Sequence, residues 1–283
     1  TTPNQPTLPD NSAWLLQVTI TSGSIAATQD ISTRRFTSTV TMDSARTSGT
    51  TARWIFEPGG MLNCNGQTIT HNGVIFAEET QIFTNCASGL TLGLRTSRVS
   101  VSWFGAVGDG VAADYAAVSA AHAAASAGHV LFFKKGNYVL SQTFYITKRL
   151  TLEGEGINVD PNSITTIQGS ALWGAHTGAA VLNLKGIALV SIRHLAIVGD
   201  ATTIPKTGLA LGRDSSLASA GRHYFEHLQV VGRFTDAAIY SIASEENTWI
   251  GLQANVLGGG APYTMAVGEN DFRSVDSFGT SSN

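Results

Sequence analysis

The feature of this sequence that most restricts its fold is a ten-residue pattern that returns after 33 residues. The segment "SIRHLAIVGD" at 191–200 is matched by "YFEHLQVVGR" at 224–233, and a looser copy follows in "WIGLQANVLGGG" at 249–260. Repeats of about 20–50 residues are typical of chains that stack one structural unit on the next. Because no single unit can bury its apolar face alone, the repeat predicts a stack of coils with one continuous core.

Each copy of the pattern contains one break in the alternation that a flat strand would show. The apolar residues are separated by three positions and then by two, at Ile192, Leu195 and Ile197 and again at Phe225, Leu228 and Val230. Side chains alternate between the two faces of a straight strand, so the break predicts a corner at the same place in successive coils. We expect His194 and His227 to stack at this corner and Arg193 and Glu226 to form an exposed ion pair.

Composition and the remaining segments indicate an all-β protein. Hydrophobic residues make up 43% of the 283 residues, enough for a large core, whereas charged residues make up only 13%. Short apolar runs such as "HVLFFKKGNYVL" are separated by glycine, asparagine, aspartate and serine, which is typical of strands joined by turns. Together with the repeat, these segments predict a parallel β-helix, or β-solenoid, over residues 51–283.

A single α-helix is expected over about residues 114–127, as a cap on the open end of the coils. Asp114 is placed to accept hydrogen bonds from the N–H groups of the first turn, and Gly128 is placed for the left-handed residue that follows a helix. The apolar stripe consists mostly of small residues that suit close packing on a flat surface: Tyr115, Val118, Ala121 and Ala125. We expect His122 and His129 to lie at the polar rim of this helix rather than in a catalytic site.

The helix is preceded by a glycine-rich turn in "WFGAVGDGVAADYAAVSAA" at 103–121. The turn has neither the G-x-G-x-x-G spacing of a dinucleotide turn nor the G-K-[ST] of a nucleoside triphosphate loop. We therefore expect no phosphate site, but a tight turn in which Asp109 and Asp114 accept backbone N–H groups. The glycines that build it are Gly105, Gly108 and Gly110.

This turn and the following "HVLFFKKGNY" resemble the entry segment of the pectate-lyase-like superfamily, whose usual form is F-G-A-x-G-D-G-x-x-D-D-x-x-A followed by P-x-G-x-Y. Ala113 stands at the first of the two acidic positions, and Lys134-Lys135 stand where a proline often lies. The upstream "WIFEPGGMLNCNGQTITHNGVIFAEETQIF" is similar to the coil that often precedes the motif in bacteriophage tailspikes. The resemblance covers roughly residues 50–280 and implies a right-handed β-helix.

The tailspike resemblance implies a homotrimeric virion tail appendage that binds bacterial surface polysaccharide, capsule or O-antigen, during host attachment and hydrolyses its glycosidic bonds. The superfamily also holds lyases, epimerases and non-catalytic virion parts, so the fold alone does not fix the activity. A non-catalytic tail adhesin or structural spike is therefore the alternative, and a secreted polysaccharide lyase is a second alternative. Residues 1–50 are expected to form a leader and a small β segment that contacts other tail or baseplate proteins. Because the sequence ends within the pattern, further coils, including catalytic ones, are expected beyond residue 283.

Hydrolysis of a glycosidic bond generally needs two carboxyl groups, about 5 Å apart for retention or about 6.5–9.5 Å apart for inversion. Among the acidic residues of the coils, Asp236 with Glu245 or Glu246 is the best candidate pair. If Glu245 and Glu246 lie on one strand, their side chains point to opposite faces, and only one of them can meet a substrate.

Aromatic and basic residues supply the candidate sugar-binding groups, which are Trp173, Arg222, His223, Tyr224 and Trp249. A lyase would instead use Arg222, His223 or Tyr224 as the base of a β-elimination, often with a metal ion that neutralises the substrate carboxylate. No cluster of histidine, cysteine and carboxylate residues has metal-ligand spacing, and G-x-S-x-G is absent, so we expect no metal and no cofactor.

Charge and cysteine content exclude several classes of protein. The formal net charge is −3 and no run of lysine and arginine occurs, so nucleic acid is not an expected partner. No stretch approaches 18 uninterrupted apolar residues, so membrane insertion is not expected. Cys64 and Cys86 are the only cysteines and form either two buried free thiols or a bridge between neighbouring coils; we expect the free thiols.

Overall fold

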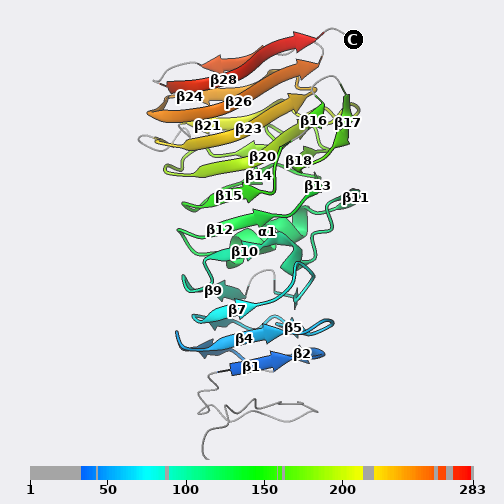
Figure 1. Cartoon of the computed structure of the whole chain (residues 1–283), viewed down its shortest axis with the longest axis vertical. Helices are drawn as coiled ribbons and strands as arrows, with labels where there is room; N and C mark the ends of the chain where they lie inside the picture. Colours follow the sequence, from blue (N-terminus) through cyan, green and yellow to red (C-terminus); the bar gives the residue numbers. More distant parts are fainter. Residues whose placement is uncertain are drawn as a thin grey trace, which may run out of the picture.

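The computed structural model is an all-β structure with parallel sheets and one α-helix in the part of the chain that it describes (Figure 1). The described residues are 33–42, 44–86, 89–157, 159–160, 163–212, 220–257, 261–265 and 270–281. The all-β class expected from the sequence is confirmed. Most of the expected leader, residues 1–32, lies outside these ranges. Within them, no helix has the length and apolar character needed to cross a membrane.

The first coils contribute one short strand to each of three parallel sheets. The sheets are β1 (Thr33–Phe36), β4 (Arg53–Phe56) and β7 (Val74–Phe76); β2 (Thr39–Thr41), β5 (Met61–Asn63) and β8 (Phe83–Thr84); and β3 (Arg46–Ser48), β6 (Ile69–His71) and β9 (Leu90–Leu92). Thr33 lies beside Arg53, and Arg53 lies beside Val74, so equivalent residues of successive coils are aligned. These coils begin at Thr33, inside the segment 1–50 that the sequence analysis set apart.

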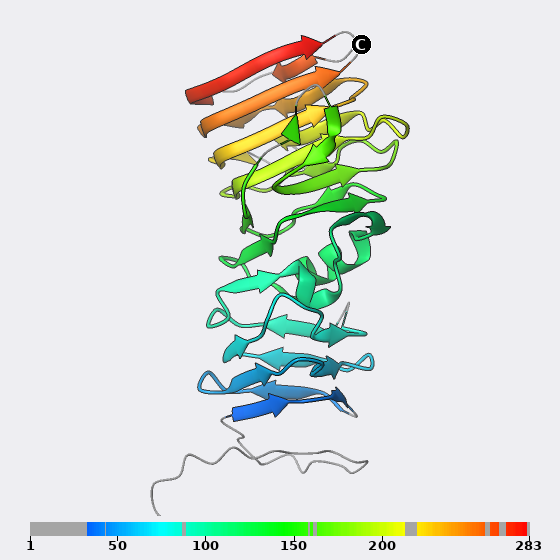
Figure 2. The ribbon, with the colours of Figure 1, turned by 45° about the vertical axis from the view of Figure 1, so that its right-hand side comes forward.

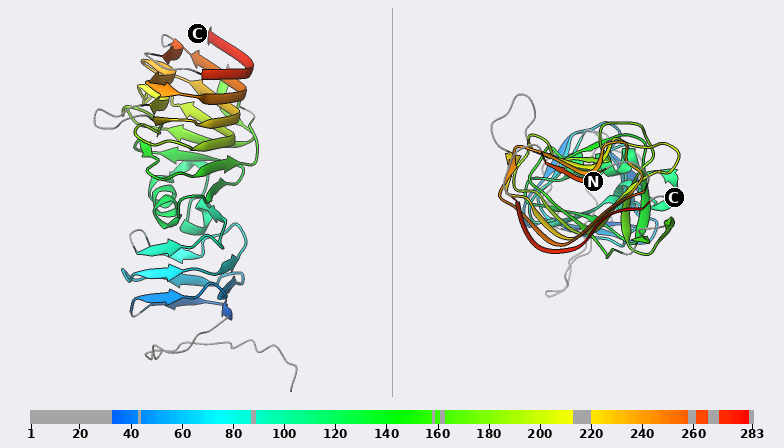
Figure 3. Two further views of the ribbon diagram at one scale, coloured as in Figure 1. Left: turned by 90° about the vertical axis from the view of Figure 1, so that its left-hand side faces the viewer. Right: turned by 90° about the horizontal axis from the view of Figure 1, so that it is seen from above.

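Two larger parallel sheets continue the stack. The first contains β10 (Arg98–Ser100), β12 (Val130–Phe133), β15 (Thr151–Gly154), β20 (Ser191–Gly199), β23 (Tyr224–Gly232), β26 (Asn247–Leu257) and β28 (Asn270–Ser281), with a branch of β11 (Asp109–Ala113), β13 (Gly136–Leu140) and β18 (Ser170–Gly174). The second contains β14 (Phe144–Tyr145), β19 (Leu182–Asn183), β21 (Thr207–Gly212), β24 (Ala237–Ile242) and β27 (Ala261–Met265). Seen along the long axis, the strands of successive coils follow one common outline (Figure 3).

Two short pairings complete the strands. β22 (Ala220–Gly221) and β25 (Ser244–Glu245) form a separate parallel pair. β16 (Val159–Asp160) and β17 (Ser163–Ile167) form a hairpin, the one antiparallel pairing within the described ranges.

Strand β20 explains the corner that the sequence predicts. Its residues 191–193 pair with β15, whereas its residues 196–199 pair with β18, so the chain changes direction between them. His194 lies at this point with a φ of 52°, and the aligned residues of the next two coils, His227 and Gly251, have φ values of 48° and 64°. The corner is confirmed, and so is the stacking of the two imidazoles, whose centroids are 5.4 Å apart.

The apolar residues on both sides of this corner face a core that runs through the stack. Aligned positions fill it coil by coil: Ile192 lies beside Phe225, and Phe225 lies beside Trp249, with the last two rings stacked 4.0 Å apart. All three side chains have no exposed surface. Burial of one such large side chain contributes about 1.5–3 kcal/mol, so the aligned core stabilises the stack of coils.

The glycine-rich turn has the architectural role expected for it. Its three glycines have φ values of 96°, 68° and 78°, which only glycine adopts without strain: Gly105, Gly108 and Gly110. The carboxylate of Asp109 accepts the N–H groups of Val111 and Ala112 at 2.8 Å each. The carboxylate of Asp114 accepts those of Val107, Gly108 and Val139 at 2.7, 3.3 and 3.2 Å. Both aspartates therefore satisfy backbone N–H groups, as predicted.

The helix α1 (Tyr115–Ala124) is shorter than the expected range 114–127. The Asp114 side chain makes no cap to α1, because its oxygens are taken by the preceding turn and by β13. Backbone helicity ends before Ala125, so Gly128, with a φ of 94°, belongs to a later turn and not to the helix end. Figure 2 shows α1 midway along the stack, with coils on both sides, so the expectation that it caps an open end is wrong.

The two histidines expected at the rim of the helix are buried instead. His122 Nε2 accepts the Thr147 N–H at 3.3 Å, and His129 Nδ1 accepts the Ser126 N–H at 3.1 Å. The rim position is taken by Lys148, whose ammonium donates to the carbonyls of His122, Ala123 and Ala125 at the C-terminal end of the helix. A cation there complements the partial negative charge of the helix end.

Cys64 and Cys86 form a disulfide, so the expectation of two free thiols is wrong. The two cysteines are 22 residues apart, close to one turn of the chain in this part of the stack, and the bond joins neighbouring coils. Their backbones are already linked by the Cys64 N–H donating to the Thr84 carbonyl at 3.0 Å. The two cysteines meet because one coil in this part of the stack is about as long as the spacing between them. The repeat at residues 191–233 has a different length and does not predict this.

Removal of this disulfide should lower the free energy of unfolding by about 3 kcal/mol. The estimate is the loop entropy that a 22-residue cross-link removes from the unfolded chain. We expect the Cys64→Ala/Cys86→Ala double variant to unfold at lower guanidinium concentration than the oxidised protein, and the reduced wild type to behave like the variant. An unfolding midpoint shared by the oxidised protein and the double variant would contradict a stabilising role.

Candidate functional site

A column of corner residues runs along the side of the stack, one corner before the bend at His194. Counting two residues back from the aligned strand starts places Arg149, Leu189, Arg222 and Glu246 above one another. The last three have φ values of 60°, 56° and 55°. The Leu189 N–H donates to the Gly221 carbonyl at 3.1 Å, and the Arg222 N–H donates to the Glu245 carbonyl at 2.8 Å, which fixes each corner on the next.

This column, with its neighbours, lines a pocket of about 300 Å³. The lining residues are Arg149, Ala188, Leu189, Ala220, Gly221, Arg222, Glu245 and Glu246. Arg222 Nε lies 2.6 Å from Glu246 Oε2, in an ion pair whose side chains are both more than half exposed. Such an exposed pair contributes at most about 1 kcal/mol to stability, so a ligand can displace either partner at little cost.

Two charges and one apolar surface in the pocket remain available to a ligand. Neither Arg149 nor Glu245 makes an ion pair with any residue that the structure describes, and both are exposed. The Leu189 side chain is 48% exposed between them. A free guanidinium, a free carboxylate and an exposed apolar side chain together match an acidic sugar, which carries a carboxylate, hydroxyl groups and an apolar C–H face.

The structure brings three of the predicted site residues into this pocket: Arg222, Glu245 and Glu246. The expectation that Glu245 and Glu246 point to opposite faces assumed that both lie on one strand. Strand β25 ends at Glu245, and Glu246 takes a left-handed conformation, so both side chains line the same pocket. Both carboxylates can therefore meet one ligand.

Asp236 does not join them. It precedes β24, whereas Glu245 follows β24, and a six-residue strand is about 20 Å long. That separation is about twice the upper limit of about 9.5 Å between the two carboxyl groups of a glycosidase. The Asp236 carboxylate instead accepts the Thr235 hydroxyl at 3.1 Å. We therefore exclude the pairing of Asp236 with either glutamate.

Two of the remaining candidates are buried. Trp249 has no exposed surface and stacks on Phe225 in the core, so it offers no ring face to a sugar. His223 is 1% exposed, its Nδ1 accepts the Val190 N–H at 3.3 Å, and burial lowers its pKa to about 4. A neutral buried imidazole cannot reach a substrate at the surface, so His223 is not a base for β-elimination.

Tyr224 and Trp173 are half-buried and already engaged. The guanidinium of Arg193 lies over the Tyr224 ring, 5.3 Å from its centroid. Trp173 Nε1 donates to Asp200 Oδ1 at 3.0 Å, and its ring packs against a small apolar cluster on the sheet of β18 and β20. Neither residue lines the pocket.

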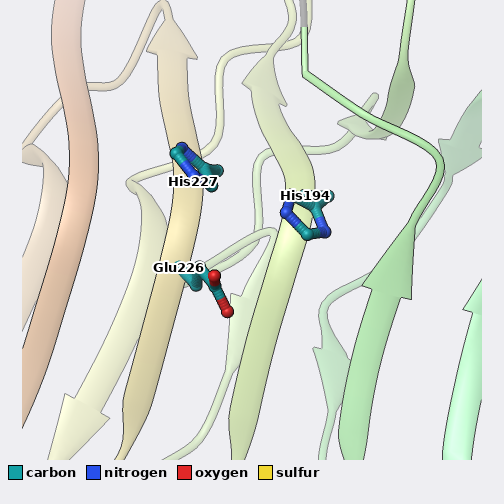
Figure 4. A group of neighbouring side chains, drawn as sticks. All are labelled: His194, Glu226 and His227. Atoms are coloured by element: carbon teal, nitrogen blue, oxygen red, sulfur yellow. The ribbon is translucent and has the colours of Figure 1, made fainter.

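A second group of polar side chains lies at the bend of β20 and β23. His194, Glu226 and His227 each place a possible ligand atom within 4.8 Å of the others (Figure 4). The predicted ion pair of Arg193 with Glu226 is present, with Nε 3.6 Å from Oε2. The sequence predicts the histidine stack and the ion pair but not a cluster of all three residues, because His194 lies 33 residues from His227; the repeat offset is the signal that aligns them.

Comparison with known proteins leaves the chain without an assigned family. No protein-family model matches it, and no curated protein matches it. Among solved structures, ORF18 of Geobacillus virus E2 is similar with a TM-score of 0.46 and 17% sequence identity, over 66% of this chain and 39% of that protein. The chain thus spans about two fifths of the length of the viral protein that it matches.

Proposed function

We propose that this chain is part of a phage tailspike-like protein, a right-handed parallel β-helix that binds an acidic bacterial surface polysaccharide at the pocket of the corner column. Parallel strands aligned coil by coil support the β-helix, and so does the glycine-rich turn that resembles the pectate-lyase-like entry segment. The location in a virion tail, the homotrimer and the contact with other tail proteins are parts of the same proposal and come from the tailspike resemblance.

One observation carries the binding proposal: the pocket contains Arg149 and Glu245, which form no ion pair with a described residue, next to the exposed apolar side chain of Leu189. Arg149 can hold a sugar carboxylate through two parallel N–H bonds. Glu245 can accept hydrogen bonds from sugar hydroxyls, and Leu189 can pack against the apolar face of the ring. All three lie on the outside of the stack, where a long polymer can lie along successive coils.

Glycosidic hydrolysis at the same pocket is the second candidate function. It is favoured by one observation, the placement of both Glu245 and Glu246 in the pocket. One carboxyl group would protonate the leaving oxygen, and the other would act as nucleophile or as the base that activates water. A non-catalytic adhesin would use the same pocket without turnover.

The test is the binding of purified protein to a panel of capsule and O-antigen polysaccharides, followed by mass spectrometry of the products. We expect at least one acidic polysaccharide to bind, and Arg149→Gln to weaken that binding about tenfold or more, since one charge-assisted contact contributes about 1.5–3 kcal/mol. Asp236→Asn, outside the pocket, is the matched control and should bind like the wild type.

The products then separate the two candidates. Fragments that contain one added water, lost in Glu245→Gln or Glu246→Gln, would establish hydrolysis, whereas binding without fragments would establish an adhesin. Products that lack the water would point to a lyase. Binding that is equal in Arg149→Gln and the wild type would contradict the pocket as the binding site.

A further inference from the structure

We propose that His194, Glu226 and His227 form a binding site for a divalent transition-metal ion, Zn²⁺ in the first place, that bridges strands β20 and β23. Figure 4 shows the two imidazoles on neighbouring strands, with the Glu226 carboxylate directed towards the strand of His194. Their ligand atoms lie within 4.8 Å of one another. Two imidazoles and a carboxylate are a donor set that suits Zn²⁺, with metal–ligand distances of about 2.0–2.2 Å. Ligand atoms of a tetrahedral Zn²⁺ lie about 3.4 Å apart, so rotations of these side chains would have to bring the three atoms closer together around the ion.

The backbone aligns the two histidines at the same corner of successive coils. His194 and His227 both have left-handed φ values, which are unfavourable for residues with a Cβ. At the aligned position of the next coil the same conformation is taken by Gly251, the residue that adopts it most easily. Two successive coils thus hold histidine in a conformation that glycine would satisfy at lower cost. Left-handed residues also form the neighbouring corner, at Leu189, Arg222 and Glu246, so this conformation belongs to the corners and serves here to place the two imidazoles side by side.

Glu226 is available to an ion although Arg193 is near it. The distance of 3.6 Å from Arg193 Nε to Glu226 Oε2 is too long for a hydrogen bond, and this Nε has no hydrogen-bond partner among the described residues. Arg193 also has other neighbours, since its guanidinium lies over the Tyr224 ring and Glu153 is aligned with it in the preceding coil. If Glu226 binds a metal ion, Arg193 therefore still lies next to the Tyr224 ring and the aligned Glu153.

The site would keep an open coordination position. Three protein ligands leave at least one position of a tetrahedral Zn²⁺ for water or for an oxygen of a ligand. His227 is exposed, and the aligned residue beyond it, Gly251, has no side chain to cover the ion. The proposal is independent of the corner pocket, which contains none of the three ligands.

Calorimetric titration of the chain of residues 1–283, without an affinity tag, with ZnCl₂ tests the site. We expect one ion per chain. His194→Asn and His227→Asn should each weaken binding tenfold or more; asparagine is chosen because it tolerates left-handed φ better than most residues. Glu226→Gln should weaken binding similarly. Arg193→Gln should tighten it several-fold, because it removes a competing cation from the carboxylate.

Asp236→Asn is the control, since it removes an exposed carboxylate that belongs neither to the cluster nor to the neighbours of Arg193, and its affinity should stay within twofold of the wild type. Circular dichroism establishes that each variant is folded. Absence of saturable Zn²⁺ binding by the wild type would overturn the proposal. Unchanged affinity in the folded His194→Asn and His227→Asn variants would do the same, because the bound ion would then lie elsewhere.

Discussion

Replacement of Asp114 by alanine should lower the free energy of unfolding by about 3–5 kcal/mol, because it leaves three partly buried backbone N–H groups without their charged acceptor. The carboxylate is 2% exposed and accepts three backbone N–H groups, from Val107, Gly108 and Val139. Each donor left unsatisfied costs up to about 1–3 kcal/mol, and the three are not fully additive. These bonds connect the glycine-rich turn to strand β13, so their loss weakens a junction that the backbone bonds from Asn137 to Gly108 and from Asp114 to Val139 still hold.

Two further variants make this prediction specific. Asp109→Ala removes a carboxylate from the same turn that accepts two N–H groups at an exposed position, so water can replace it and the loss should be much smaller than that of Asp114→Ala. Asp114→Asn keeps one acceptor oxygen and should fall between the two. Guanidinium unfolding measures all three. Equal losses for Asp109→Ala and Asp114→Ala would show that burial of the Asp114 bonds contributes nothing.

The features that local sequence determines were predictable. The turn of Gly105, Gly108 and Gly110 follows from the conformational freedom of glycine, and the corner at His194 follows from one break in the apolar alternation. The burial of Trp249 could have been predicted as well. The repeat aligns Trp249 with Phe225, whose position in the pattern predicts that it faces the core; the prediction of sugar binding by Trp249 rests on its aromatic ring alone.

The features that depend on coil length and on distant contacts were not predictable from local patterns. The Cys64–Cys86 bond requires that one coil in the first part of the stack be about as long as the 22 residues between the two cysteines. No repeat in that part of the sequence shows this coil length. The position of α1 midway along the stack depends on what lies on either side of it, which its amphipathic pattern does not encode. Gln229 exchanges two hydrogen bonds with the Val159 backbone, 70 residues away, and so fixes the β16–β17 hairpin on the sheet.

The site was predicted in part for the same reason. The prediction of Arg222, Glu245 and Glu246 rests on residue type, and the structure joins them because the corner column aligns residues 222 and 246. The prediction of Asp236 rests on residue type too, but the whole length of β24 separates it from Glu245. Parallel strands of successive coils align residues by register, so the register decides which carboxylates can act together.

Acidification should destabilise the protein strongly between about pH 6.5 and pH 4, because three buried histidines are held neutral. Burial lowers the pKa of His71, His122 and His223 to about 4 in each case. His122 Nε2 and His223 Nδ1 each accept a backbone N–H, and protonation would remove these acceptors. His71 lies between the Ser48 hydroxyl and the Val74 carbonyl, under the Trp54 ring.

The direction follows from the two pKa values of each histidine. In the unfolded chain the pKa is about 6.5, so as the pH falls below 6.5 the unfolded state binds protons that the folded state does not. Stability is therefore complete above pH 6.5 and is lost progressively towards pH 4, at up to about 1.4 kcal/mol per pH unit for each histidine. With allowance for partial solvent screening, we expect a loss of about 5 kcal/mol for the three together.

Guanidinium unfolding at a series of pH values measures this loss, and one variant assigns it. His223→Gln keeps an amide oxygen that can accept the Val190 N–H but has no titrating group, so its stability should fall less steeply with acidification, by about one third of the wild-type slope. The comparison concerns how the free energy of unfolding changes with pH. A variant that is less stable than the wild type by the same amount at every pH therefore does not affect it. A wild-type stability that is constant between pH 6.5 and pH 4 would mean that these imidazoles gain protons in the folded protein as readily as in the unfolded chain, and that burial does not hold them neutral.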